Sequence, residues 1–178
     1  TGTGIPIALG VIYVAVGRRA GLDIEGVNFP GHFVVRVRLP GGEEMFVDPL
    51  AGAVVDEAML AERVKLLQGD QTELTPEHLA SAPARAIVAR MLNNLKIVTL
   101  QQGDLGRALG YCDWIVELMP HNPVELRDRA VILERLEAFE AAANDYEKLV
   151  ELVPDEAARR KLKGRIRALR RRRPKTLH

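Results

Sequence analysis

A histidine and an aspartate lie at the ends of two successive segments whose patterns predict antiparallel strands. His32 precedes the alternating stretch FVVRVRL, and Asp48 closes the stretch EMFVD. A carboxylate that holds an imidazole is the usual orienting arrangement of a hydrolytic or acyl-transfer site. The short turn PGGE joins the two segments and brings their ends together, so we expect a hydrogen bond between these side chains. Whether the pair does chemistry depends on a nucleophile.

The register of the predicted hairpin brings the pair within reach. A hairpin centred near Gly41 and Gly42 places Asp48 opposite about Val35, with His32 roughly one residue pair further along. Each residue alone has an ordinary explanation, because a histidine after a Pro-Gly turn often bonds to backbone and an aspartate accepts turn N–H groups. The two together favour a site.

The elements that must position this pair form a small α+β unit. Residues 6–20, PIALGVIYVAVGRRA, are apolar nearly all round, so we expect a buried helix with proline in its first turn. Residues 24–29 are a candidate short strand, and in FVVRVRL the side chains of Arg36 and Arg38 share one face. DEAMLAERVKLL predicts a further helix, and the polar stretch QGDQTELTPEH is typical of a linker.

The second half of the chain changes to pairs of helices that repeat with a constant period. GDLGRALGYCDWIVELMP ends at Pro120, and EAFEAAANDYEKLVELVP ends at Pro154. At this offset, which is about 34 residues, Ala108 matches Ala142, and such small residues let two helices approach closely. An apolar helix precedes each unit, and a last helix from Asp155 would cap the stack. Period, small residues and prolines together resemble tetratricopeptide repeats.

The composition is that of a globular chain with an acidic body and a basic end. The chain has 178 residues, of which 47% are hydrophobic, and a formal net charge of +1. Of its 25 basic residues, 11 lie between Arg159 and Lys175, whereas the other 14 stand against 24 acidic residues. This basic tail suits nucleic acid, anionic lipid or an acidic partner, but it lacks interleaved aromatics for base stacking. We favour a solvated capping helix.

Several function classes lack support in the sequence. The single cysteine, Cys112, excludes an internal disulfide and fits a reducing compartment. No apolar run approaches the ~20 residues that a membrane span needs. The other histidines are scattered and no phosphate-binding glycine motif is evident, so we predict neither a cofactor nor a metal. Because the chain opens at Thr1 without methionine, we expect that an upstream part precedes it.

Three stretches in order resemble a known family: GIPIALGVIYVAVGRRAGL, GVNFPGHFVVRV and MFVDPL. They are similar to the transglutaminase-like core, a papain-type α+β fold, and above all to its SirB-type branch, in which tetratricopeptide repeats follow that core. The resemblance covers essentially the whole chain. It implies that His32 matches the catalytic histidine and Asp48 the orienting aspartate. Gly4-Ile5-Pro6 stands where the core has Gly-x-Cys, so Pro6 occupies the position of the nucleophile.

Proline has no nucleophilic side chain, and the substitutes that the sequence offers are weak. Thr1 and Thr3 lie near the helix start, where capping is the ordinary role of Thr3. Cys112 matches Tyr146 in the repeat alignment, within a helix, so we interpret it as a packing residue.

We therefore predict an N-terminally truncated transglutaminase-like core at residues 1–68 and helical repeats with a capping helix at residues 82–178. The favoured function is a non-catalytic pseudo-transglutaminase that binds a peptide or protein partner through a His32–Asp48 cleft and through the repeats. The alternative is a hydrolase or acyl-transferase with an unusual nucleophile. Nucleic-acid binding through the basic tail is a weaker third hypothesis. The resemblance implies a cytoplasmic bacterial protein with a regulatory role.

Overall fold

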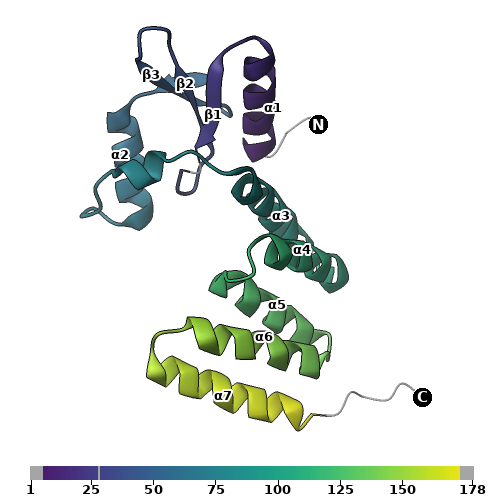
Figure 1. The fold of residues 1–178 in the computed structure, drawn as a ribbon. Coiled ribbons are helices and arrows are strands. Elements are labelled where there is room, and N and C mark those ends of the chain that lie inside the picture. Colours follow the sequence, from purple (N-terminus) through teal and green to yellow (C-terminus); the bar gives the residue numbers. More distant parts are fainter. Residues whose placement is uncertain (1–5, 28, 173–178) are drawn as a thin grey trace. The chain divides into compact units, whose positions relative to one another are not determined.

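The computed structural model describes residues 6–27 and 29–172, which form two compact units (Figure 1). The first unit comprises residues 1–87 and the second residues 88–178, with the boundary inside helix α3 (Ala84–Gln101). Each unit has its own hydrophobic core. Within the described part of the chain, no helix is both long and apolar enough to cross a membrane.

The first unit is a four-stranded antiparallel meander with helices packed on it. The strands follow the order β1-β2-β3-β4, so each strand pairs with its neighbours in sequence. This architecture confirms the predicted α+β class. Its elements are α1 (Pro6–Arg19), β1 (Asp23–Val27), β2 (Val34–Arg38), β3 (Glu44–Asp48), β4 (Ala53–Val55), α2 (Glu57–Gln68) and the short 3-10 helix η1 (Pro76–Leu79).

Helix α1 packs on β1 and β2 through two glycines. A Cβ built at Gly10 would come within 2.1 Å of the ring of Phe33, and one at Gly17 within 2.8 Å of Ile24. The prediction that this helix is buried is wrong, because the short strands cover only one side of it. The other side leaves three large apolar residues exposed: Ile12, Tyr13 and Val16.

An apolar cluster holds α2 to the sheet. Leu60 and Val64, one helical turn apart, are fully buried and pack with Val34 and Phe46. Asp56 precedes the helix and caps it, since its side chain accepts the N–H of Met59 at 2.8 Å. The cap and the apolar stripe together fix where α2 begins and which side of it faces the strands.

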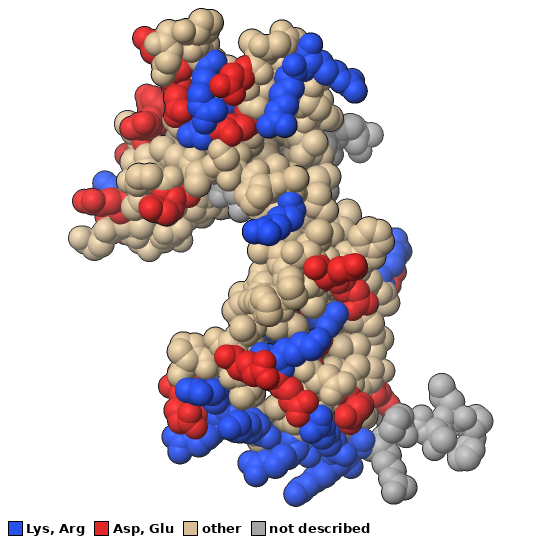
Figure 2. Space-filling view, viewed as in Figure 1, with Lys and Arg blue, Asp and Glu red and all other residues tan. Residues whose placement is uncertain are grey.

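Charged residues occupy the outer part of β2, on the face that the alternating pattern predicts. Arg36 donates to Glu25 of β1 through Nε at 2.8 Å. Arg38 donates to Glu25 Oε1 through Nη2 at 2.5 Å and to Glu44 Oε1 through Nε at 3.1 Å. Figure 2 shows the positive and negative side chains interleaved over these strands. The charges of this surface are therefore largely paired with one another.

The hairpin of β2 and β3 forms one register away from the prediction. Val35 pairs with Val47, not with Asp48. Cross-strand partners share a face of the sheet, so Val35 faces the same way as Val47, whereas Asp48 shares the opposite face with Phe46, toward α2. The sequence pattern does not reveal β4, which is three residues long and pairs with β3 from Ala53.

The second unit consists of helix pairs, as the repeat in the sequence predicts. Ala108 and Ala142, which occupy equivalent positions of two repeats, are both fully buried. Asp104, Asn122 and Asp155 each precede a helix and accept a backbone N–H from its first turn. The helices after α3 are α4 (Leu105–Leu118), α5 (Pro123–Arg135), α6 (Phe139–Leu152) and α7 (Glu156–Arg170).

A buried lysine joins the two repeats. Lys96 of α3 has 2% of its area exposed, and its Nζ donates to Glu125 Oε2 at 2.8 Å and Asp128 Oδ2 at 2.7 Å in α5. Burial would lower the pKa of Lys96, but the hydrogen bonds and charges of Asp128 and Glu125 raise this pKa above its ordinary value. The ammonium group therefore stays charged inside the helix stack.

Candidate functional site

The Pro-Gly-His sequence forms a tight turn that delivers His32 to the end of β2. Gly31 has a φ of +66°, in the left-handed region that favours glycine, and a Cβ there would lie 2.8 Å from Leu67. The backbone N–H of His32 closes the turn by donating to the carbonyl of Phe29 at 3.2 Å. Phe33 is buried, whereas 24% of the His32 side chain is exposed. The imidazole therefore lies at the edge of the core.

Asp48 is the centre of the site and is almost completely buried, with 2% of its area exposed. Its Oδ1 accepts the backbone N–H groups of Leu50 at 2.9 Å and Ala51 at 3.1 Å. Its Oδ2 lies 2.8 Å from His32 Nε2. The hydrogen bond predicted between histidine and aspartate is thus present.

A third residue, Arg63 of α2, completes the cluster, and the sequence pattern does not single it out. Its Nη1 and Nη2 both donate to Asp48 Oδ2 at 3.2 Å. The one signal in the sequence is position, because Arg63 lies beside the apolar stripe formed by Leu60 and Val64. A cation at that border of α2 is placed to meet a carboxylate at the end of β3.

The hydrogen bonds of this cluster keep Asp48 ionised. Burial alone would raise the pKa of Asp48, because it removes the charged form from water. The hydrogen bond and the charge of His32 oppose that effect, as do the N–H groups of Ala51 and Leu50, and the pKa of Asp48 lies below its ordinary value. The site therefore contains a buried negative charge with several donors around it.

This arrangement has the geometry of the orienting half of an acyl-transfer site. Because an ionised carboxylate only accepts hydrogen bonds, a neutral His32 ring donates through Nε2–H and has its lone pair on Nδ1. A general base needs such a fixed tautomer. In an acyl-transfer site the carboxylate also stabilises the positive charge that develops on the histidine. Here the guanidinium of Arg63 already binds the same carboxylate oxygen, Oδ2.

The candidate nucleophiles near the start of α1 lie mostly outside the described part of the chain. Thr1 and Thr3 lie outside the described residues. Helix α1 begins at Pro6, about one turn before Gly10. Gly10 lies against the ring of Phe33, the residue after His32. The start of the helix is therefore at the same end of the sheet as His32. The side chain at position 6 is not among the described ones, and the sequence gives it as proline.

Cys112 belongs to the second unit and packs in its core, as the repeat alignment predicts. It is fully buried in α4, in a cluster with Ala108 and Ile132. Burial raises the pKa of the Cys112 thiol to about 12. At neutral pH this thiol is therefore protonated and a poor nucleophile.

Comparison with known proteins agrees with both units. Residues 1–93 match the family model of the transglutaminase-like superfamily, and residues 95–167 match that of the tetratricopeptide repeat. Since the first match covers more than half of the chain, this protein belongs to the transglutaminase-like superfamily. The predicted order, a transglutaminase-like core followed by tetratricopeptide repeats, is confirmed.

Relatives of the chain carry the names UPF0162 and SirB1. A UPF0162 protein of Vibrio cholerae is 30% identical over 175 residues, which are 98% of this chain and 65% of that protein. One of Xylella fastidiosa is 36% identical over 155 residues, or 85% and 55% of the two chains. Protein SirB1 of Salmonella typhimurium is 26% identical over 166 residues, or 93% and 62%. The SirB-type affiliation is confirmed, and the chain spans less than two thirds of these relatives.

Proposed function

We propose that this protein is a non-catalytic member of the transglutaminase-like superfamily that binds a peptide or protein partner. In this proposal residues 1–68 form a pseudo-transglutaminase part that engages its ligand near His32 and Asp48. Residues 82–178 form the repeats, and they supply a second binding surface. The protein acts in the bacterial cytoplasm and has a regulatory role.

The bonding of Asp48 is the observation that carries this proposal. Both carboxylate oxygens are engaged: Oδ1 by two backbone N–H groups, and Oδ2 by His32 and Arg63. The carboxylate thereby ties together β3, α2 and the turn before β2. Such a role needs no nucleophile, which agrees with the proline at position 6. Tetratricopeptide repeats commonly bind other proteins, which supports the second half of the proposal.

Covalent labelling tests the absence of catalysis. The purified protein is incubated with thiol-directed and hydroxyl-directed acylating probes, and the adducts are counted by intact mass spectrometry. We expect the same labelling for the wild type and for His32→Ala. An active transglutaminase serves as the positive control for the probes, and Cys112→Ser accounts for any reaction of the single cysteine. Labelling that requires His32 would overturn the proposal.

A second candidate function is a hydrolase or acyl-transferase with an unusual nucleophile. The specific observation in its favour is the 2.8 Å contact between His32 Nε2 and Asp48 Oδ2, which is the orienting contact of such enzymes. This candidate predicts an acyl adduct on one hydroxyl or thiol, located by peptide mass spectrometry and lost in His32→Ala. If no such adduct forms at any probe concentration, this candidate is dismissed.

A further inference from the structure

A groove on the second unit runs between α5 and α7 and has a volume of about 850 Å³. Residues of α3 and α6 complete its lining. Part of that lining is apolar and open to solvent, since Val124 is 61% and Val131 44% exposed. Two buried residues, Ile132 and Leu149, and the partly buried Leu162 also line the groove. An apolar surface of this kind favours a ligand that also carries apolar side chains.

Three cations border this groove without a carboxylate partner in the part of the chain that the structure describes. Arg127, Arg135 and Lys161 are exposed and line the groove, and none of them forms an ion pair with a described residue. By contrast, most arginines of the first unit's sheet are paired across strands. The groove therefore has positive charge that its own surroundings do not neutralise.

The carboxylates beside the groove are already engaged elsewhere. Asp128 lies 2.7 Å from the buried ammonium group of Lys96. Glu134 is ion-paired with Arg165. Arg165 balances Glu134, whereas Asp128 shares the single cation Lys96 with Glu125, so that trio keeps one negative charge. Against the three cations of the groove, the balance of charge stays positive.

The repeat explains why the cations lie together. Arg127 and Lys161 are separated by the same offset as Pro120 and Pro154, so they occupy equivalent positions on α5 and α7. Equivalent positions of stacked repeats face the same way, and both residues line the groove. The stacking of repeats therefore produces a row of positive charge along the groove. Figure 2 shows Lys and Arg side chains gathered over α7.

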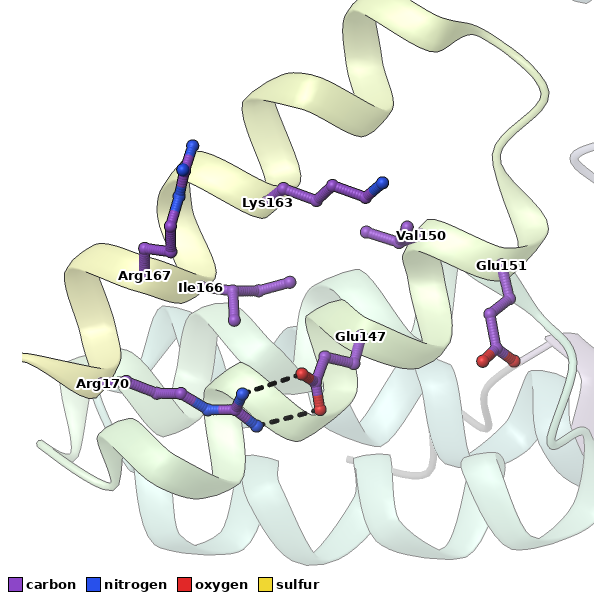
Figure 3. Close-up of a pocket in the computed structure, with 7 residues that line it drawn as sticks. All are labelled: Glu147, Val150, Glu151, Lys163, Ile166, Arg167 and Arg170. Carbon is purple, nitrogen blue, oxygen red and sulfur yellow. Dashed lines mark hydrogen bonds and ion pairs between the residues drawn. The ribbon is translucent and has the colours of Figure 1, made fainter.

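A second pocket of about 600 Å³, between α6 and α7, makes a useful contrast (Figure 3). Its lining includes the cations Lys163, Arg167 and Arg170, but also the carboxylates Glu147 and Glu151. Arg170 binds Glu147 at 2.9 Å. This pocket has mixed charge, so it lacks the excess of positive charge that distinguishes the groove.

We infer that the groove binds an acidic, extended segment of a partner protein, with apolar side chains against Val124 and Val131 and carboxylates at Arg127, Arg135 and Lys161. The inference rests on the proposed function, because it specifies what kind of partner segment the repeats bind. The chain's own basic tail does not suit the groove, because its charge has the same sign. Among the described residues of the lining, Tyr146 is the one aromatic, and it is only 6% exposed, so the groove offers no aromatic ring on which RNA bases could stack.

Selection from a displayed library of random peptides tests the inference on the full chain. The enriched peptides should carry net negative charge and several apolar residues. Fluorescein-labelled copies of the most enriched peptides then give dissociation constants by fluorescence anisotropy, at low and at physiological salt. Affinity should fall as salt rises, because the contacts are ionic.

Two charge-matched double variants locate the binding surface. Arg127→Glu with Lys161→Glu changes the groove, and Lys163→Glu with Arg167→Glu makes the same change in charge at the pocket of Figure 3. We expect the groove variant to bind at least about tenfold more weakly, and the control variant to stay within about twofold of the wild type. Circular dichroism confirms that both variants are folded.

The outcomes separate the inference from the proposed function. The inference is overturned if no peptide is enriched, if the enriched peptides are neutral or basic, or if the two variants bind equally. It is also overturned if single-stranded RNA or phosphatidylserine vesicles bind through the groove while acidic peptides do not. None of these results depends on His32, whereas the labelling test of the proposed function depends on His32 alone.

Discussion

The two units of this protein place their charges in opposite ways. The first unit buries a carboxylate, Asp48, and surrounds it with donors, while the arginines of its sheet are paired with acids. The second unit buries a cation, Lys96, between two carboxylates, and three cations of its groove, Arg127, Arg135 and Lys161, have no ion-pair partner among the described residues. Charge in the first unit therefore holds the structure together. In the second unit, the charged residues that stabilise the fold, such as Lys96, are different from the groove cations that are available to a ligand.

Removing Asp48 should produce the largest effect. In Asp48→Ala two backbone N–H groups lose their acceptor and Arg63 loses its partner, and we expect a loss of about 3–5 kcal/mol in unfolding free energy of the first unit. Urea titration followed by peptide-resolved hydrogen exchange reports each unit separately. Glu44→Ala, which removes an exposed partner, should cost less than about 1 kcal/mol. Equal stability of Asp48→Ala and wild type would show that the cluster is not an anchor.

Removing the buried cation should have the next largest effect, in the second unit. Lys96→Met keeps the length of the side chain but leaves Glu125, which is 7% exposed, without its cation, and should cost about 3 kcal/mol. Adding Glu125→Leu removes the buried charge and should recover most of that loss. The measurement is the same unfolding experiment, read from peptides of α3 and α5. A double variant as unstable as the single one would contradict this account.

The sequence predicts the repeats better than it predicts the site. The constant period fixes the helix pairs because each repeat makes the same local contacts, as the buried positions Ala108 and Ala142 illustrate. His32 and Asp48 can be predicted because they end adjacent strands of one hairpin. Arg63 cannot, since its contact with Asp48 depends on how α2 docks on the sheet. Docking is a tertiary event, and no local pattern encodes it.

The exposed face of α1 shows the same limit. An apolar sequence predicts burial, but burial requires a partner on every side, and the four short strands provide one on a single side. The packed face is recognisable only from the structure, in which Phe33 lies against Gly10 and Ile24 lies against Gly17. No pattern in the sequence indicates which face of this helix meets the sheet.

A pair of glycine substitutions compares the packing of the two units. Gly10→Ala would push a methyl group into the ring of Phe33, and should destabilise the first unit by about 1–3 kcal/mol. Gly110 lies inside α4, where an added Cβ would meet no described atom within 4 Å. Gly110→Ala should therefore stabilise the second unit by about 0.5–1 kcal/mol, the helix-propensity difference. Thermal unfolding with hydrogen exchange measures both, and destabilisation by Gly110→Ala would contradict the open space at that position.

The opposite signs of the buried charges predict opposite responses to pH, with smaller effects than the substitutions. The pKa of Asp48 is lowered in the folded state, so its contribution to stability is present above the ordinary value of 3.8 and is lost as the pH falls below it. The first unit should therefore lose stability in acid. Asp48→Asn should be less stable at neutral pH and should depend less on pH below 4.

The second unit should weaken in alkali instead. The pKa of Lys96 is raised in the folded state, so its contribution is present below the ordinary value of 10.5 and is lost as the pH rises above it. Cys112 acts in the same direction, because burial raises its pKa from 9.0 to about 12 and ionisation would require its exposure. Tyr146 also acts in this direction, because burial raises its pKa from 10.0 to about 12. Unfolding in Cys112→Ala with Tyr146→Phe therefore isolates the lysine, and adding Lys96→Met with Glu125→Leu should remove the contribution of Lys96. If the second unit of Cys112→Ala with Tyr146→Phe kept its full stability well above pH 10.5, Lys96 would not be held as a buried cation.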